Sequence, residues 1–380
     1  MIYLDNAATT KPFEDTLKES VNYSYENFYN PSSVYLPAFE VKKYIKEQKE
    51  QLKNILGANE CELIFTSGAT ESNNLFLQGV LTSNKKEEYI FSLGEHASIY
   101  EVANIIKSKG YTVHFAKLTK NGQVDIDHLL SLVNLNTRLV SIIHVSNETG
   151  AINDIKTIVK LVKQKNSKTL VHSDGVQAFS KINVNISDLG IDAYTISGHK
   201  IHALKGIGAL YIKKSVNIKP IIFGGGQENN FRSGTENVLG ILSLVKSATK
   251  LYIKQKENYE NIKNLKIIFL NELKPLNNIV LHAQNDNVSP YIISLSVMGI
   301  KSEILVHMLE KKGVLVSTGS SCSSNKKQAG NRILEAMGCT KEEVLGSIRV
   351  SFSEFNEPNE VKLAGKIFKE TVNELIQKIK

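Results

Sequence analysis

The sequence has few of the residues that mark disulfide-linked, metal-binding or membrane-spanning proteins. Its 380 residues include three cysteines, Cys61, Cys322 and Cys339, without a CxxC pair. An odd number without ligand spacing argues against a disulfide framework and a structural zinc site, so we expect reduced thiols and no metal. No apolar run approaches the ~18 residues of a membrane span, and the start lacks the basic and apolar regions of a signal peptide. These absences favour a cytoplasmic protein.

Arginine is also scarce. The formal net charge is +8, yet only four of the 46 basic residues are arginines, namely Arg138, Arg232, Arg332 and Arg349. The lysines are spread along the chain without a run of five or six, which indicates a compositional bias; docking of acidic proteins or tRNA is the weaker alternative, and we expect no direct nucleic-acid binding. Because arginine presents a planar fork of donors, each arginine in so lysine-rich a chain is a candidate for a specific role.

Apolar runs and amphipathic segments alternate along the first half of the chain in the order of an α/β protein. Such alternation predicts a largely parallel sheet covered by helices on both faces. Ligands of these sheets bind at the carboxyl ends of the strands. Strands are expected at 62–66, 89–93, 112–116, 139–145 and 169–173, and helices at 37–56, 98–109, 127–135 and 155–164.

Beyond this region the pattern changes to long helices around short strands, which predicts a smaller α+β domain. The helices are expected at 237–265, 302–312 and 358–378, and the strands at 291–297, 314–317 and 347–352. The length favours two or three domains. We therefore expect a large α/β domain over 13–250 and a small domain over 251–380 that also includes 1–12.

The tetrapeptide Ser197-Gly198-His199-Lys200 follows the apolar run 192–196, which reads as a strand leading into a loop. Strand alternation lets Ser197 and His199 point the same way, beside the amine of Lys200. An amine can form a Schiff base with an aldehyde, and two donors suit a phosphate, so the stretch is compatible with pyridoxal phosphate (PLP). The turn 67–74 offers a second phosphate site at a helix N-terminus. The alternatives are a solvated lysine and an ordinary helix cap.

Polar side chains follow several of the predicted strands. Asp174 could pair with a pyridine nitrogen and keep it protonated, Gln177 or Asn147 could donate to the ring's phenolic oxygen, and His96 could stack on the ring and move protons. Taken singly, each residue is also compatible with an ordinary loop position or a helix cap. Their combination beside Lys200 favours a PLP site.

Three further features lie in the second half of the chain. The stretch 232–237 places small donors before a helix and, in a homodimer, could reach the partner's phosphate; its alternative is a capped helix start. Cys322 lies in a polar loop of small residues in which Lys326 and Lys327 favour the thiolate. Arg349, inside a strand, suits an α-carboxylate, with a strand-edge salt bridge as the alternative. Cys61 and Cys339 have apolar neighbours and read as packing residues.

Taken together, these motifs resemble the cysteine desulfurases of the NifS/IscS group, which are class V aminotransferases among the fold-type I PLP enzymes. The resemblance covers nearly the whole chain. It includes the runs Tyr3-Leu4-Asp5-Asn6-Ala7-Ala8-Thr9-Thr10, Phe65-Thr66-Ser67-Gly68-Ala69-Thr70-Glu71-Ser72-Asn73-Asn74, Ser197-Gly198-His199-Lys200, Gly224-Gly225-Gly226-Gln227-Glu228, Arg232-Ser233-Gly234-Thr235-Glu236-Asn237, Gly319-Ser320-Ser321-Cys322 and Ser347-Ile348-Arg349.

The resemblance implies a role for each of twelve residues. Lys200 would hold PLP, Cys322 would be the nucleophile, and His96 would stack on the ring and share proton transfer with Lys200. The remaining contacts would be Ala69, Thr70, Ser197, His199 and, across a homodimer, Thr235 at the phosphate; Asp174 at the pyridine nitrogen; Gln177 and Asn147 at the ring oxygen; and Arg349 at the substrate carboxylate, with Asn147 also near the substrate.

The resemblance further implies that L-cysteine is converted to L-alanine and that its sulfur becomes a persulfide on Cys322. An iron–sulfur cluster scaffold or a tRNA thiolation enzyme would accept that sulfur. A selenocysteine lyase and a catalytically silent sulfur-transfer scaffold are the alternatives. The chain departs from the family pattern at several positions, among them Tyr35, Ala203-Leu204 and Ser353-Glu354.

Overall fold

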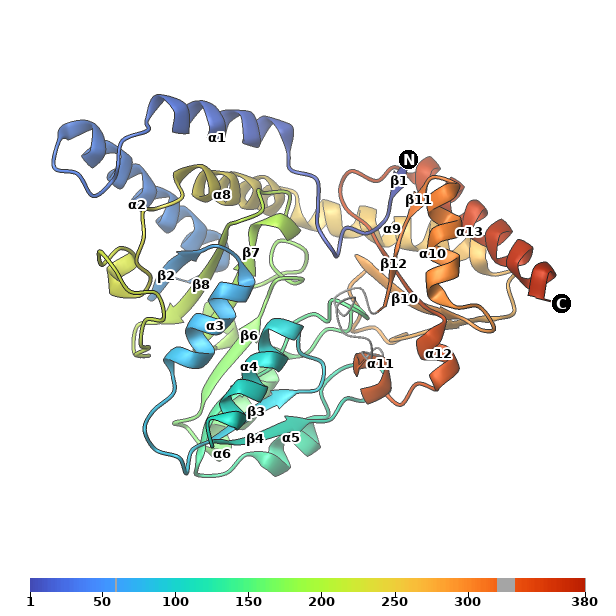
Figure 1. Ribbon diagram of the computed structural model, residues 1–380, viewed down its shortest axis with the longest axis horizontal. Coiled ribbons are helices and arrows are strands. Elements are labelled where there is room, and N and C mark those ends of the chain that lie inside the picture. The colour runs from blue at the N-terminus through green and yellow to red at the C-terminus, as the bar shows by residue number, and fades with distance from the viewer. Residues whose placement is uncertain (59, 320–331, 380) are drawn as a thin grey trace.

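The computed structural model describes residues 1–58, 60–319 and 332–379, which form two lobes joined by a long helix. Figure 1 shows the larger lobe around one sheet and the smaller lobe beside both chain termini. The joining helix, α9 (Gln255–Leu273), runs from one lobe to the other. Among the described residues, no helix combines the length and apolar character needed to cross a bilayer.

The large lobe contains a seven-stranded sheet in which every neighbouring pair is parallel except those made by the strand β8 (Gly208–Lys213). Its strands contain many β-branched and aromatic residues and, apart from the edge strand Thr112–Ala116, are buried almost throughout, as expected of a sheet covered on both faces. The strand order is β2 (Cys61–Thr66), β8 (Gly208–Lys213), β7 (Ala193–Ser197), β6 (Leu170–Asp174), β5 (Thr137–Ser141), β3 (Glu88–Ser92) and β4 (Thr112–Ala116).

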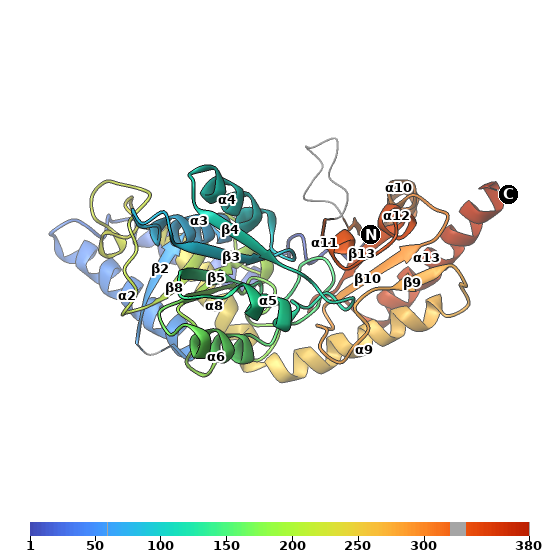
Figure 2. The same cartoon turned by 90° about the horizontal axis from the view of Figure 1, so that it is seen from below.

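Helices cover both faces of this sheet and bury a separate apolar core on each (Figure 2). On one face lie α3 (Ala69–Gly79) and α4 (Ala97–Ser108). The other face is covered by α2 (Leu36–Leu56), α5 (Ile126–Leu132), α6 (Ile155–Lys165) and α8 (Val238–Ile253), while α1 (Glu14–Glu26) packs on α8, and α7 (Ile186–Leu189) is a single short turn.

The small lobe has its own core, which also includes Ile2 and Leu4 from the N-terminus. Its antiparallel sheet has the order β12 (Ser317–Thr318), β13 (Ser347–Ser351), β10 (Ile292–Val297) and β9 (Ile279–Leu281). A two-stranded parallel sheet joins β1 (Ile2–Tyr3) to β11 (Val314–Leu315). The helices are α9, α10 (Ser302–Lys311), α11 (Arg332–Ala336), α12 (Lys341–Leu345) and α13 (Pro358–Ile379). The domain boundaries at 13–250 and 251–380 with 1–12 stay a prediction.

Two predicted elements are each divided in the structure. The helix expected at 237–265 is two helices, α8 and α9, separated at Lys254. No proline or glycine marks this break; α8 buries residues in the large-lobe core and α9 in the small-lobe core, so the chain bends where it passes between them. The strand expected at 314–317 is divided into β11 and β12, which belong to different sheets. β5 also ends at Ser141, four residues before the predicted end of that strand.

Candidate active site

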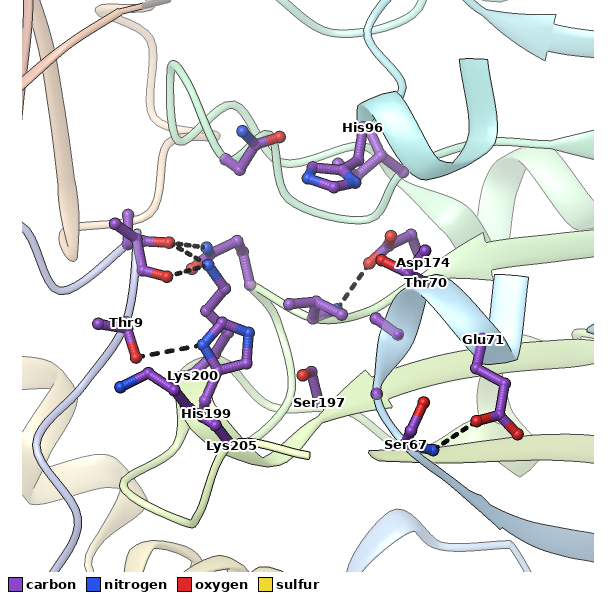
Figure 3. A pocket seen from close by; sticks show the side chains of 18 of the residues that line it. Thr9, Ser67, Thr70, Glu71, His96, Asp174, Ser197, His199, Lys200 and Lys205 are labelled. Atoms are coloured by element: carbon purple, nitrogen blue, oxygen red, sulfur yellow. Dashed lines mark hydrogen bonds between the residues drawn. The ribbon is translucent and has the colours of Figure 1, made fainter. Parts of the chain in front are cut away.

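A cavity of about 540 Å³ lies at the carboxyl ends of β6 and β7, where the two lobes meet. Figure 3 shows Lys200, His199 and Ser197 on one side of it, with Asp174 and Thr70 toward the other and His96 at the beginning of α4. Ten of the twelve predicted site residues line this cavity: Ala69, Thr70, His96, Asn147, Asp174, Gln177, Ser197, His199, Lys200 and Arg349.

The other two predicted residues, Thr235 and Cys322, are not among the residues that line this cavity. Thr235 lines a smaller neighbouring cavity of about 130 Å³, which shares Ser67 and Gly206 with the larger one. Thr235 is exposed in the single chain. This exposure is compatible with the prediction that it contacts a second subunit. Cys322 lies outside the described residues.

Lys200 is placed by the short turn that follows β7. The strand ends at Ser197, and a single 3-10 turn over Gly198–Lys200 directs the side chain toward the N-terminal segment. The Nζ atom of Lys200 donates to the carbonyl oxygens of Ala7 and Ala8, each at 2.6 Å. The Nε2 atom of Gln177 donates to the same Ala7 oxygen at 2.9 Å. Two backbone carbonyls thus hold the amine at the cavity.

The N-terminus of α3 borders the cavity. Gly68 precedes this helix with no side-chain cap, so the first N–H groups of the helix, which have no intrahelical acceptor, face the cavity. The backbone at Gly68 has a φ of 150°, and a Cβ on Gly208 would lie 2.7 Å from the Gly68 Cα. Only glycine at position 208 lets this turn approach β8 closely. The turn therefore lies beside Ser197, which lines the same cavity.

His199 and His96 are both uncharged in this environment. Burial, followed by the charge of Lys200, lowers the pKa of His199 to about 4, and the ring contacts the Thr9 hydroxyl through Nδ1 at 3.2 Å. His96 caps α4 because its Nδ1 accepts from the Ser98 N–H at 3.1 Å. Burial lowers the pKa of His96 as well, despite the opposing effect of Asp174. The Nδ1 atom of His96 acts as an acceptor, so the ring proton is on Nε2.

Arg349 reaches the cavity from β13 and is almost fully buried. Its Nη2 donates to Asp5 Oδ1 at 3.0 Å and its Nη1 to the Asn147 carbonyl at 3.0 Å; Nη1 also lies 3.6 Å from Glu148 Oε1. A salt bridge of the kind considered for this residue therefore exists, although β13 lies inside its sheet and not at the edge, and the same guanidinium lines the cavity. Burial raises the pKa of Glu148, with Arg349 acting in the opposite direction.

Comparison with known proteins places this geometry in a family. The family model for class V aminotransferases matches residues 2–363. The chain belongs to this family. A cysteine desulfurase IscS of Dictyoglomus turgidum is 36% identical over 351 residues, which cover 92% of this chain and 88% of that protein. A cysteine desulfurase of a Nostoc species is 33% identical over 377 residues, covering 99% and 94%.

Solved structures agree with this assignment. A NifS-like protein superposes on this class V aminotransferase with a TM-score of 0.92 at 32% identity, covering 98% of this chain and 99% of that one. The protein SspA, solved in complex with cysteine, gives 0.83 at 25% identity, covering 94% and 100%. The sequence-based assignments to the cysteine desulfurase group and to the fold-type I architecture are confirmed.

The residues of the cavity fit PLP. An aldehyde would meet the amine of Lys200, a phosphate would meet the N-terminus of α3 with Ser197 and His199, and a ring nitrogen would meet Asp174. The Oδ1 atom of Asn147 is buried without a hydrogen-bond partner among the residues that the structure describes. An acceptor left unpaired at a cavity is compatible with a ligand that donates to it.

Sequence reasoning missed several residues that line the cavity of this class V aminotransferase. The stretch Ala7-Ala8-Thr9 was named above only as part of a run shared with the family. Its carbonyl groups contact Lys200, and Thr9 contacts His199. Backbone carbonyls carry no residue-type signal, so only the family resemblance pointed to this segment. Lys205 and Glu71 also line the cavity without having been singled out.

Proposed function

We propose that this chain is a PLP-dependent cysteine desulfurase that converts L-cysteine to L-alanine and retains the sulfur on Cys322 as a persulfide. One observation carries the proposal. The amine of Lys200 lies in a cavity that also contains a buried carboxylate, Asp174, an uncharged imidazole, His96, and a buried guanidinium, Arg349. A binding scaffold would need none of these groups.

PLP, when bound, would supply an aldehyde for amines and a ring that takes up electrons from the substrate. Lys200 would hold the aldehyde carbon, and the N–H groups of α3 with Ala69, Thr70, Ser197 and His199 would hold the phosphate. Asp174 would keep the pyridine nitrogen protonated. Because Lys181 donates to Gln177 Oε1 at 2.7 Å, the Nε2 group of Gln177, which also donates to the Ala7 carbonyl, would be the donor to the ring oxygen. Asn147 would contact the same oxygen.

The remaining groups act on the substrate. Arg349 would bind the α-carboxylate through its planar fork, which lies beside the Asn147 backbone. Lys200, released from the aldehyde, and the neutral His96 would move protons at the α- and β-carbons. Cys322 would attack the substrate sulfur: the carbon–sulfur bond breaks, a sulfur–sulfur bond forms, and the carbon retains the electron pair and is protonated to give alanine.

A homodimer is part of this proposal. Large apolar side chains are exposed together along α1, α2 and the segment between them, namely Tyr25, Phe28, Val34, Leu36 and Phe39. An exposed cluster of this kind is typical of a protein interface. In such a dimer, Thr235 would contact the partner's phosphate. The sulfur acceptor would be an iron–sulfur scaffold or a tRNA thiolation enzyme.

The proposal is tested by incubating the PLP-loaded protein with L-cysteine and a thiol reductant, and by quantifying alanine and sulfide. We expect both products from the native protein. Lys200→Ala should abolish both, and Cys322→Ala should abolish sulfide release. A native protein that binds PLP but forms no alanine would exclude the desulfurase function.

A further inference from the structure

Arg232 is one of the four arginines of the chain, and the proposed function gives it no role. Its guanidinium makes a bidentate contact with the Glu71 carboxylate: Nε donates to Oε1 at 2.8 Å, and Nη2 donates to Oε2 at 3.4 Å. The Ser67 N–H donates to the same Oε2 at 2.8 Å (Figure 3). Only 24% of the Arg232 side chain and 11% of the Glu71 side chain are exposed, so solvent screens this ion pair weakly.

The ion pair lies at the border between the two neighbouring cavities. Glu71 lines the larger cavity, which also contains Lys200, whereas Arg232 lines the smaller one. Ser67 lines both. The carboxylate therefore lies beside the space in which a cofactor would bind, and the guanidinium holds it from the neighbouring cavity.

Glu71 belongs to the first turn of α3, the helix whose N-terminus would meet the phosphate of PLP. A carboxylate is favoured at this end of a helix for the same reason as a phosphate, because the free N–H groups and the positive end of the helix dipole attract both. Two anions at the same helix end repel each other. The Glu71 carboxylate therefore opposes phosphate binding unless its charge is compensated.

Arg232 supplies the compensating charge. Burial acts to raise the pKa of Glu71, but the hydrogen bonds from Arg232 and Ser67 outweigh it and leave the pKa below its usual value. The carboxyl group is therefore ionised at neutral pH. Within residues 1–58, 60–319 and 332–379, Glu71 forms no ion pair except the one with Arg232.

We propose that Arg232 is a positioning residue that acts through Glu71: it holds and neutralises this carboxylate, and thereby allows a phosphate group to bind at the N-terminus of α3. The inference rests on the proposed function in one respect, because that function places the phosphate of PLP at this helix end. Arg232 also begins the stretch 232–237, so a role confined to holding that stretch is the alternative that the experiment must exclude.

The test is cofactor binding, which needs no turnover. The dissociation constants of PLP and of pyridoxal, which lacks the phosphate, are measured by absorbance titration of the full-length protein at pH 8. We expect Arg232→Met to weaken PLP binding by about tenfold, because the uncompensated Glu71 charge repels the phosphate. Pyridoxal binding should change by less than about twofold, because pyridoxal carries no phosphate charge for Glu71 to repel.

A second substitution separates the charge of Arg232 from a structural role. Glu71→Gln removes the repelling charge, so the double variant Arg232→Met/Glu71→Gln should bind PLP as the native protein does. If Arg232 only held the stretch 232–237, the double variant would bind PLP as weakly as Arg232→Met. The difference in PLP affinity between the native protein and Arg232→Met should also shrink at about 1 M salt, where the Debye length is about 3 Å.

Lys163→Met is the matched control. Lys163 forms an ion pair of 2.6 Å with Asp192 in the same lobe, and its loss also leaves a buried carboxylate without a cation, but neither residue lines the larger cavity. PLP affinity should therefore be unchanged in this variant. If Arg232→Met does not fold, Glu71→Gln alone carries the test: it leaves Arg232 as an uncompensated cation and should bind PLP at least as tightly as the native protein does.

The outcomes separate this inference from the proposed function. Equal weakening of PLP and pyridoxal binding in Arg232→Met, or a double variant that does not recover PLP binding, would overturn the role of Arg232 even if the native protein forms alanine. A native protein that binds PLP but forms no alanine would exclude the desulfurase function, while the titrations would still decide whether Arg232 compensates Glu71.

Discussion

The cavity has two sides that are built in different ways. The sheet side, formed by Asp174, Ser197 and Lys200, consists of residues that end or directly follow β6 and β7. The chain-end side, formed by residues 5–8 and Arg349, joins positions 344 residues apart through the Asp5–Arg349 ion pair. The first side needs only one folded sheet. The second exists only when the small lobe has folded around both ends of the chain, so the two sides should fail under different substitutions.

The strongest test of this difference is Arg349→Leu, which removes the cation of the chain-end side. Asp5 and the buried Glu148 then lose their basic partner. Removing one partner of a buried ion pair costs about 3–5 kcal/mol, and we expect the free energy of unfolding to fall by that amount in urea denaturation. Alanine formation should be lost, while PLP absorbance should persist because the sheet side is unchanged.

Arg138→Leu is the matched control. Arg138 lies near the beginning of β5 and does not line the cavity. Alanine formation should therefore persist in this variant. Loss of PLP binding in Arg349→Leu under conditions where the protein remains folded would show that the two sides are not independent.

The same difference explains what the sequence could predict. Lys200 and Asp174 were identified because each follows a run of strand-forming residues, and parallel strands bring such positions to one edge of a sheet. The Ala7 and Ala8 carbonyls and the Asp5–Arg349 pair depend on how the small lobe folds, which no local pattern encodes. The break at Lys254 was missed for a related reason, since both flanking segments are helical and only the separation of the two cores requires it.

The departures from the family pattern were visible in the sequence, but their consequence was not. His202 and Glu354, from opposite lobes, form a contact of 2.8 Å between Nε2 and Oε2. The Nδ1 atom of His202 contacts the Lys11 carbonyl at 2.7 Å, and because a carbonyl oxygen only accepts, this nitrogen donates. Tyr291 also donates to Glu354 at 2.9 Å. This buried cluster connects the large lobe to the small lobe.

Glu354→Gln should lower the free energy of unfolding by less than Arg349→Leu does. Burial raises the pKa of Glu354, but the hydrogen bond and charge of His202 outweigh it and leave the pKa below its usual value. Hydrogen bonds to charged groups are worth about 1.5–3 kcal/mol, and we expect that loss at pH 7. A carboxyl group with a lowered folded-state pKa stabilises the fold above its unfolded pKa of about 4.3, and this contribution is lost as the pH falls further.

The corresponding measurement is urea denaturation of both proteins between pH 7 and pH 3. The difference in unfolding free energy between native protein and variant should be constant down to about pH 4.3 and should decrease below it. A difference that stays constant to pH 3 would mean that the Glu354 charge does not stabilise the contact between the lobes.

The smallest loss of stability is expected for Arg332→Lys. This substitution tests the contacts that hold α11 against the large lobe. Arg332 begins α11, directly after residues 320–331, and donates to the carbonyls of Leu93 and Glu95. Its guanidinium also lies 4.0 Å from the centre of the Tyr100 ring. Lysine retains the charge but cannot donate to two carbonyls while stacking on a ring, so we expect a loss of about 1 kcal/mol.

A double-mutant cycle with Tyr100→Leu shows how much of this loss comes from the contact with the Tyr100 ring and how much from the two carbonyl contacts. If Arg332 acts through the planar stack as well as through the two carbonyls, the effects of Arg332→Lys and Tyr100→Leu should be smaller together than their sum. Strict additivity would place the whole effect in the two carbonyl contacts. In either case His96 directly follows one of the contacted residues, Glu95, so an Arg332 variant that changes the NMR signals of the His96 imidazole would show that α11 is coupled to the site.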